Sequence, residues 1–211
     1  SQITEFLLQQ GVKLLILACN TMAAVAHQAV TGLSPVPVLD VIDAGARSAV
    51  AGKRTKKVGI IGTPATIASN AYEQAIHRHN PDIRIVSQAC PLFVPLVEEG
   101  WLDHQVTRLT AREYLEPMLT DNIDTLVLGC THYPLIKELL QEVVGNDIRL
   151  VDSAEAMAEM AETLLREKNL SNPDRMPPDY KFYVTDVPYR FQAIGERFLG
   201  RQLFPVQLIK W

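Results

Sequence analysis

The sequence lacks several features that would assign it to a specialised class of protein. It has only 3 cysteines in 211 residues, which excludes a disulfide-rich secreted scaffold and favours free thiols in a reducing cytosol. No targeting segment is apparent, and the apolar run at 12–19 is far too short to cross a bilayer. We therefore expect a cytoplasmic protein with no membrane partner.

Charge of one sign is not concentrated anywhere along the chain. The 20 basic and 24 acidic residues are interleaved and give a net charge of −4. Aromatic residues make up only 7% of the chain, and no basic stripe carries interleaved aromatic side chains, so nucleic acid is not expected as a partner. The expected ligand is therefore a small molecule.

The chain alternates short apolar segments with amphipathic ones. Strands are expected at 14–18, 36–39, 58–61, 83–87, 126–128, 148–151, 182–184 and 206–209. Helices are expected at 21–30, 43–51, 65–79, 105–119, 134–144, 154–167 and 189–199. The basic segment 53–57 is expected as a solvated loop and the polar segment 169–179 as a linker. This alternation predicts an α/β fold with mostly parallel sheets flanked by helices.

Two segments far apart in the sequence share one plan. Residues 14–21 and 125–132 each read as an apolar strand, a small residue, a cysteine and two polar residues that open a helix. The cysteines are Cys19 and Cys130. Because ligands of open α/β sheets bind at the carboxyl ends of strands, both thiols are placed where chemistry normally occurs. The repeat predicts two pseudo-symmetric lobes with the active site in the cleft between them.

A cysteine between a strand and a helix start is in a setting that favours its thiolate. The helix dipole and unpaired backbone N–H groups are expected to lower the thiol pKa from about 8.5 towards neutrality. One such cysteine alone is more simply a buried apolar residue. Two in matched settings favour a reaction that removes a proton from one face of a carbon and returns a proton to the other. The duplication thus favours racemisation over nucleophilic catalysis.

The residues around the cysteines resemble the signature segments of the bacterial glutamate racemase family. These are Ala-Cys-Asn-Thr-Met-Ala at 18–23 and Gly-Cys-Thr-His-Tyr-Pro-Leu at 129–135, with further family segments at 61–72 and 90–98. Related aspartate racemases usually carry an acidic residue where His132 stands. The similarity covers essentially the whole chain. It implies interconversion of L- and D-glutamate without a cofactor, which supplies D-glutamate for peptidoglycan in the cell wall.

The resemblance implies a role for each motif residue. The Cys19 position deprotonates D-glutamate, the Cys130 position deprotonates L-glutamate, and His132 assists Cys130. Glu98 matches a carboxylate that orients the site. The positions that hydrogen-bond the substrate are Asn20, Thr21, Thr63, Thr66 and Thr131.

The resemblance also implies the lobes and the assembly. The first lobe takes residues 1–42 and 155–211, and the second takes 43–154. A homodimer is consistent with the family, whose members commonly form dimers.

Simpler roles remain open for several of these residues. A role as helix caps alone remains open for Asn20, Thr21, Thr63 and Thr66. For His132, the simpler alternative is a supporting residue that does not act on protons. Cys90 has no polar partner in sequence and is expected to be structural. A zinc ion at Cys19, Cys130 and His132 is conceivable, but no closely spaced ligand pair supports one. No lysine has a Schiff-base context and no glycine loop cradles phosphate, so we expect no metal and no cofactor.

The chain departs from the family pattern in two places. Family members usually begin with a glycine-rich segment that contains an aspartate and a serine, followed by Pro-Tyr-Gly, and neither precedes Cys19 here. We expect that an N-terminal segment of the parent protein is missing. Asp40 also stands near a position that is usually glycine. The alternatives are therefore an aspartate racemase or another relative that acts on a carboxylated α-carbon, and an inactive truncated fragment that only binds ligand.

Overall fold

The computed structural model describes residues 1–52, 55–173 and 177–211, which fall into two compact units. The first comprises Ser1 and Ile3–Leu170, and the second comprises Gln2 and Ser171–Trp211. Residues 53–54 of the expected basic loop and 174–176 of the expected linker lie outside the described residues. Both motif cysteines belong to the first unit. The lobe boundaries at 42/43 and 154/155 stay a prediction.

The first unit contains two parallel sheets. One pairs β1 with β2, and the other has the order β4-β3-β5-β6. The strands are β1 Leu15–Leu17, β2 Val38–Asp40, β3 Lys57–Gly62, β4 Arg84–Ala89, β5 Thr125–Gly129 and β6 Arg149–Val151. The expectation of an α/β fold with parallel sheets and flanking helices is confirmed.

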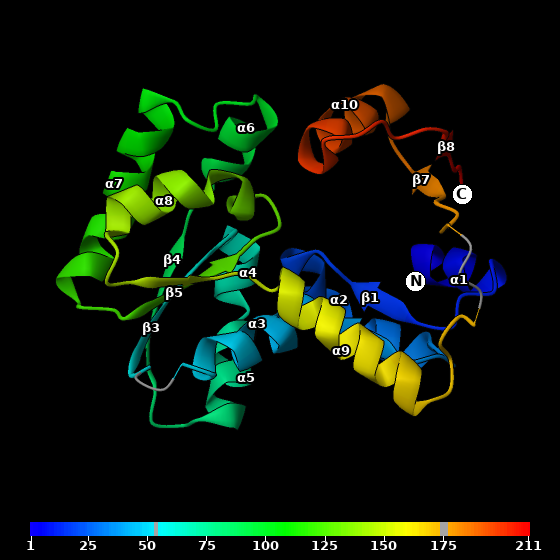
Figure 1. The fold of residues 1–211 in the computed structure, drawn as a ribbon, viewed down its shortest axis with the longest axis horizontal. Coiled ribbons are helices and arrows are strands. Elements are labelled where there is room, and N and C mark those ends of the chain that lie inside the picture. Colours follow the sequence, from blue (N-terminus) through cyan, green and yellow to red (C-terminus); the bar gives the residue numbers. More distant parts are fainter. Residues whose placement is uncertain (53–54, 174–176) are drawn as a thin grey trace. The chain divides into compact units, whose positions relative to one another are not determined.

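Helices connect and cover these strands. They are α1 Gln2–Gln9, α2 Asn20–Leu33, α3 Val41–Val50, α4 Pro64–Ala68, α5 Ala71–His79, α6 Phe93–Glu98, α7 Gln105–Thr120, the 3-10 helix η1 Tyr133–Ile136, α8 Lys137–Val144 and α9 Ala154–Glu167. In Figure 1, α7 and α8 lie on one face of the four-stranded sheet and α3 and α5 on the other. No helix among the described residues has both the length and the apolar character needed to cross a membrane.

The central strands β3 and β5 form the middle of the core. Ile60, Ile61, Leu126 and Leu128 are each at most 1% exposed, as expected for parallel strands covered by helices on both faces. The two strands approach closely at their carboxyl ends, where Gly62 pairs with Gly129. A Cβ atom at Gly129 would lie 2.7 Å from the carbonyl oxygen of Ile61, so this position requires glycine. Cys130 follows immediately at the edge of the sheet.

Three of the expected elements differ in detail from those observed. The helix expected at 65–79 is two helices, α4 and α5, because Asn70 adopts a left-handed conformation with φ 54°. The helix expected at 134–144 begins as η1, with Pro134 in its first turn. The strand expected at 14–18 is not fully buried, since Ile16 is 42% exposed. The reason is that β1 pairs only with β2 among the described strands. Helix α6, which contains Pro95, was not expected from the sequence.

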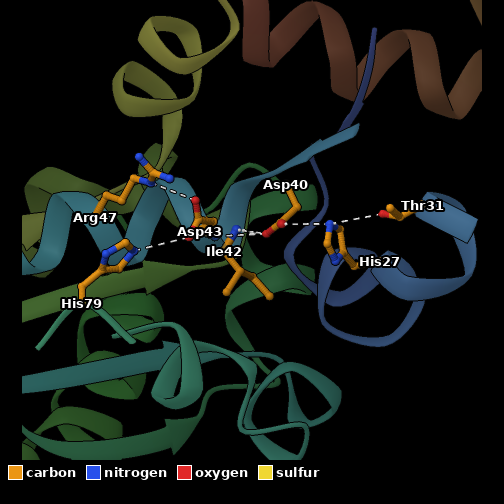
Figure 2. Close-up of polar contacts among 7 residues, drawn as sticks. All are labelled: His27, Thr31, Asp40, Ile42, Asp43, Arg47 and His79. Atoms are coloured by element: carbon orange, nitrogen blue, oxygen red, sulfur yellow. Dashed lines mark hydrogen bonds and ion pairs between the residues drawn. The ribbon is translucent and has the colours of Figure 1, made fainter. Parts of the chain in front are cut away.

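Asp40 begins α3, where its side chain caps the helix (Figure 2). Its Oδ1 accepts hydrogen bonds from the backbone N–H groups of Ile42 at 2.9 Å and Asp43 at 3.0 Å. Its Oδ2 lies 3.4 Å from Nε2 of His27 in α2. Figure 2 also shows the contacts of Asp43 with Arg47 and His79. Asp40 therefore supplies the N-cap of α3.

The second unit is a small β-α-β arrangement. Strand β7 (Phe182–Val184) pairs in parallel with β8 (Val206–Leu208), and α10 (Pro188–Leu199) connects them. Each of these three elements falls within two residues of the range expected from the sequence. Neither motif cysteine lies in this unit.

Candidate active site

Cys19 lies between β1 and α2. It is the N-cap residue of α2, with an extended backbone, and its carbonyl oxygen accepts the first helical hydrogen bond from Ala23 at 2.8 Å. The residue is exposed. Its thiol therefore lies at the positive end of a 14-residue helix and is accessible to a ligand.

Cys130 occupies the matching position after β5, but in a different environment. It is only 6% exposed. Burial raises the pKa of the Cys130 thiol to about 11, although hydrogen bonds from the backbone N–H groups of His132 and Tyr133 act to lower it. The expectation of a thiol pKa near neutrality is thus wrong for Cys130, because desolvation outweighs the two backbone donors at the start of helix η1.

The two thiols lie within electrostatic range of each other. The charge of Cys19 contributes to the raised pKa of Cys130, after burial and the His132 backbone hydrogen bond. Two thiolates would repel each other, so a state in which both sulfurs are charged is disfavoured. A two-base proton exchange requires one sulfur to accept a proton while the other donates one.

His132 and Glu98 form a chain of contacts that ends at Cys130. The Cys130 Sγ lies 3.8 Å from Nδ1 of His132, and Nε2 of the same ring lies 3.3 Å from Oε1 of Glu98. Glu98 is the last residue of α6, the helix that the sequence did not predict. The structure thus brings together three of the residues that the motifs singled out. A carboxylate, an imidazole and a thiol in this order can move a proton from sulfur to nitrogen.

Three threonine hydroxyls from two separate segments form a cluster. Thr21 lies 2.8 Å from Thr63 and 3.2 Å from Thr66, and Thr63 lies 2.9 Å from Thr66, measured between their Oγ1 atoms. Thr63 also caps α4 by accepting a hydrogen bond from the backbone N–H of Thr66. The capping role and a binding role are therefore compatible. Thr131, next to Cys130, is exposed.

Asn20 has a buried partner that received no role from the sequence. The hydroxyl of Tyr72 in α5 donates a hydrogen bond of 2.6 Å to Oδ1 of Asn20. Each residue is 2% exposed. A tyrosine in a helix that buries Ala75 and Ile76 predicts only a core position, so its polar partner could not be identified from the sequence.

The remaining cysteine is separate from this constellation. Cys90 is fully buried and donates a hydrogen bond to the carbonyl oxygen of Gln88 at 3.6 Å. Burial raises the pKa of its thiol to about 12, so a structural role fits it. Among the described residues, no three His, Cys, Asp or Glu side chains are grouped as a metal ion would require.

Comparison with protein families places the chain among the racemases. Residues 2–161 match the family described as Asp/Glu/Hydantoin racemase, and the chain belongs to this family. It is therefore an enzyme of the isomerase class.

The similar proteins and solved structures include glutamate racemases from several bacteria. The chain is 71% identical over 209 residues to a glutamate racemase from Syntrophus aciditrophicus (strain SB), a match that covers 99% of this chain and 77% of the relative. A crystal structure of the glutamate racemase from Francisella tularensis in complex with D-glutamate superposes with a TM-score of 0.91 at 41% identity, covering 99% of this chain and 78% of that one. A glutamate racemase isoform from Bacillus anthracis gives a TM-score of 0.93 at 36% identity, with 99% and 77% covered.

Proposed function

We propose that this chain is a cofactor-independent glutamate racemase in which Cys19 and Cys130 exchange protons with opposite faces of the α-carbon. The observation that carries the proposal is the pair of thiols, each following a parallel strand and each within electrostatic range of the other. A single nucleophilic cysteine would not account for the second. The glutamate racemases among the relatives, one of them bound to D-glutamate, support glutamate as the substrate.

In the direction from L- to D-glutamate, Cys130 acts as the base. Its thiol proton passes to Nδ1 of His132, and Glu98 stabilises the resulting imidazolium. The Cys130 thiolate then takes the α-proton of L-glutamate, and the Cys19 thiol gives its own proton to the opposite face of the carbanion. In the reverse direction the Cys19 thiolate takes the α-proton of D-glutamate, and Cys130 returns a proton to the other face.

Polar groups near the two helix starts hold the substrate in this mechanism. Hydroxyls and amides at helix N-termini bind carboxylates without a full positive charge. Asn20 and Thr21 lie in the first turn of α2, while Thr63 and Thr66 lie at the start of α4. With Thr131, they would bind the carboxylates and the amine of glutamate. Because the Thr21 hydroxyl contacts the hydroxyls of Thr63 and Thr66, one anion could accept hydrogen bonds from both helix starts.

The wider biological role belongs to the same proposal. It comprises the supply of D-glutamate for peptidoglycan, a cytoplasmic location, and assembly as a homodimer.

Exchange of the α-proton with solvent deuterium tests the proposal directly. The purified protein is incubated in D₂O with each enantiomer of glutamate and of aspartate, while circular dichroism follows racemisation. We expect both enantiomers of glutamate to converge on the same mixture with deuterium at the α-carbon. Cys19→Ser and Cys130→Ser should each slow racemisation by about a hundredfold or more, the range typical of a lost acid or base. Cys90→Ala, which removes the buried structural thiol, should racemise glutamate as the native protein does.

Three outcomes would overturn the proposal. Binding of glutamate without deuterium uptake would indicate a non-catalytic binding protein. Faster racemisation of aspartate would indicate the related specificity. Full activity in both serine variants would exclude the two-thiol mechanism.

A further inference from the structure

Tyr72 connects the two cysteine-bearing segments although it belongs to neither. Its hydroxyl donates to Oδ1 of Asn20, the residue directly after Cys19. On the other side, a Cβ atom built at Gly129, the residue directly before Cys130, would lie 3.1 Å from Cε2 of the Tyr72 ring. The ring therefore packs against the backbone that leads into one cysteine while its hydroxyl holds the residue that follows the other.

A second glycine fixes the ring from α3. A Cβ atom at Gly45 would lie 2.9 Å from the Tyr72 hydroxyl oxygen and 3.0 Å from Cε1. These distances are shorter than side chains normally tolerate, so the absence of a side chain at Gly45 and Gly129 leaves the space that Tyr72 fills. Because Tyr72 is 2% exposed, its ring has little freedom to move. A rigid ring gives its hydroxyl a fixed position relative to Asn20.

The hydrogen bond also fixes the orientation of the Asn20 amide. A tyrosine hydroxyl that donates to Oδ1 directs the amide NH₂ group away from Tyr72. Only the NH₂ end can donate to a carboxylate, so a flipped amide would present an oxygen to the substrate anion instead. Tyr72 would thereby set the chemical character of Asn20 as well as its position.

We propose that Tyr72 is a positioning residue for racemisation, acting through Asn20 on the geometry of proton transfer at Cys19. This inference rests on the proposed function, because it assigns the same two thiols to the two faces of the α-carbon. Tyr72 itself touches no reacting atom. Its effect should therefore appear in the step that Cys19 performs and much less in the step that Cys130 performs.

Primary isotope effects separate these two steps. When the transfer at Cys19 becomes slower, that transfer limits the rate more strongly in both directions. The isotope effect on kcat/KM for α-deuterated D-glutamate should then rise, since Cys19 removes that deuteron. The isotope effect for α-deuterated L-glutamate should fall, since Cys130 removes the deuteron in a step that no longer limits the rate. A uniform loss of folded protein would leave both isotope effects unchanged.

The main variant is Tyr72→Phe, which removes only the hydroxyl. We expect kcat/KM to fall about tenfold, less than the roughly hundredfold that a displacement of a full ångström can cost. The two isotope effects should change in opposite directions. The matched control is Tyr114→Phe in α7, where the lost hydroxyl accepts a hydrogen bond from the backbone N–H of Leu92. The control should retain both native isotope effects.

Two further variants keep the test decisive if Tyr72→Phe folds poorly. Gly45→Ala retains the Tyr72 hydroxyl but displaces it, because the added methyl group would lie too close to it. Alanine also favours the helical conformation of α3. It should change the isotope effects in the same directions. Combining Tyr72→Phe with Asn20→Ala should reduce kcat/KM no further than Asn20→Ala does alone, since both substitutions remove the same interaction.

The possible failures are distinguishable. If the native protein exchanges no α-proton of glutamate, the proposed function fails. If the native protein racemises glutamate but both Tyr72→Phe and Gly45→Ala keep native isotope effects, the positioning role of Tyr72 is excluded and the two-thiol mechanism stands. Independent, additive losses in the double variant would also exclude action through Asn20.

Discussion

Nε2 of His132 lies 3.3 Å from Oε1 of Glu98, so the carboxylate contacts the ring nitrogen that is remote from Cys130. A carboxylate in this position holds a proton on Nε2 and leaves Nδ1 facing the Cys130 sulfur as a proton acceptor. The arrangement has a consequence for a buried thiol. Because burial raises the pKa of Cys130 to about 11, its thiolate is scarce unless a nearby group takes the proton. The pair of Glu98 and His132 supplies that group.

Glu98→Gln should therefore lower kcat with a smaller effect on KM. The amide retains a similar shape but cannot neutralise the imidazolium that forms when Cys130 loses its proton. We expect a fall in kcat of about tenfold to a hundredfold, at the lower end of what an acid–base assistant contributes. Steady-state racemisation of L-glutamate measures it. Glu99→Gln, an exposed neighbour at the end of α6, is the control and should keep the native kcat. An unchanged kcat in Glu98→Gln would show that this carboxylate does not assist Cys130.

The three cysteines should differ in their rates of alkylation by iodoacetamide. Because the thiolate is the reactive form, a pKa of about 11 makes the reaction of Cys130 slow at neutral pH and about tenfold faster with each pH unit until that pKa is approached. Exposed Cys19 should be modified first. Peptide mass spectrometry at a series of pH values gives the rate at each position.

Cys90 serves as the internal control for this experiment. Its thiol has a pKa raised to about 12 and is completely buried, so it should remain unmodified over the range in which Cys130 begins to react. With a pKa of about 11, only a small fraction of the Cys130 thiol is ionised at about pH 8. Modification of Cys130 as fast as Cys19 at that pH would therefore contradict the raised pKa.

Much of the architecture could be predicted because it depends on local patterns. The alternation of apolar strands and amphipathic helices placed β3, β5 and α7 within one residue of their observed ends. The plan shared by the segments around Cys19 and Cys130 also located both thiols at strand ends. Such patterns are visible in sequence because a buried parallel strand needs a continuous apolar run.

The environment of each site residue could not be predicted in the same way. The matched sequence contexts of Cys19 and Cys130 suggested similar thiols, but one is exposed and the other buried. β5 is an inner strand of the four-stranded sheet, whereas β1 pairs only with β2 among the described strands, and the neighbours of β5 are distant in sequence. Likewise, the contact between Tyr72 and Asn20 spans 52 positions and leaves no periodic signal. Tertiary packing decides both features.

The threonine cluster leads to a prediction about substrate binding. Thr63→Val removes the hydroxyl that contacts Thr21 and Thr66 while preserving the branched shape. We expect KM for both glutamate enantiomers to rise about tenfold, since the loss of one hydrogen bond to a charged group has an effect of this size. The free energy of unfolding should also fall by about 1 kcal/mol, because Thr63 caps α4. Steady-state kinetics and urea denaturation measure the two effects.

Two variants separate binding from capping at this position. Thr63→Ser keeps a hydroxyl that can serve both purposes and should remain close to the native protein in KM and stability. Thr31→Val removes a threonine hydroxyl of α2 whose only described partner is His27 in the same helix, and it should leave KM unchanged. If Thr63→Val loses stability but keeps the native KM, Thr63 is a helix cap alone.

The N-cap role of Asp40 leads to a prediction about stability. Its carboxylate accepts two backbone hydrogen bonds at the start of α3, so Asp40→Ala should lower the free energy of unfolding by about 1 kcal/mol. Asp40→Asn retains a capping oxygen, and Asp40→Gly exposes the helix start to water, so each should cost only a few tenths of a kcal/mol. Urea denaturation of the three variants gives the order.

The position of glycine in that order decides the interpretation. If capping is the main contribution of Asp40, glycine is much better tolerated than alanine. If glycine is as destabilising as alanine, the contact between Asp40 and His27 outweighs the cap, because both substitutions remove the contact while only alanine lacks an adequate cap. Asp40→Asn separates the two effects: it keeps the cap but loses the charge, so a cost equal to that of alanine would exclude capping as the main role.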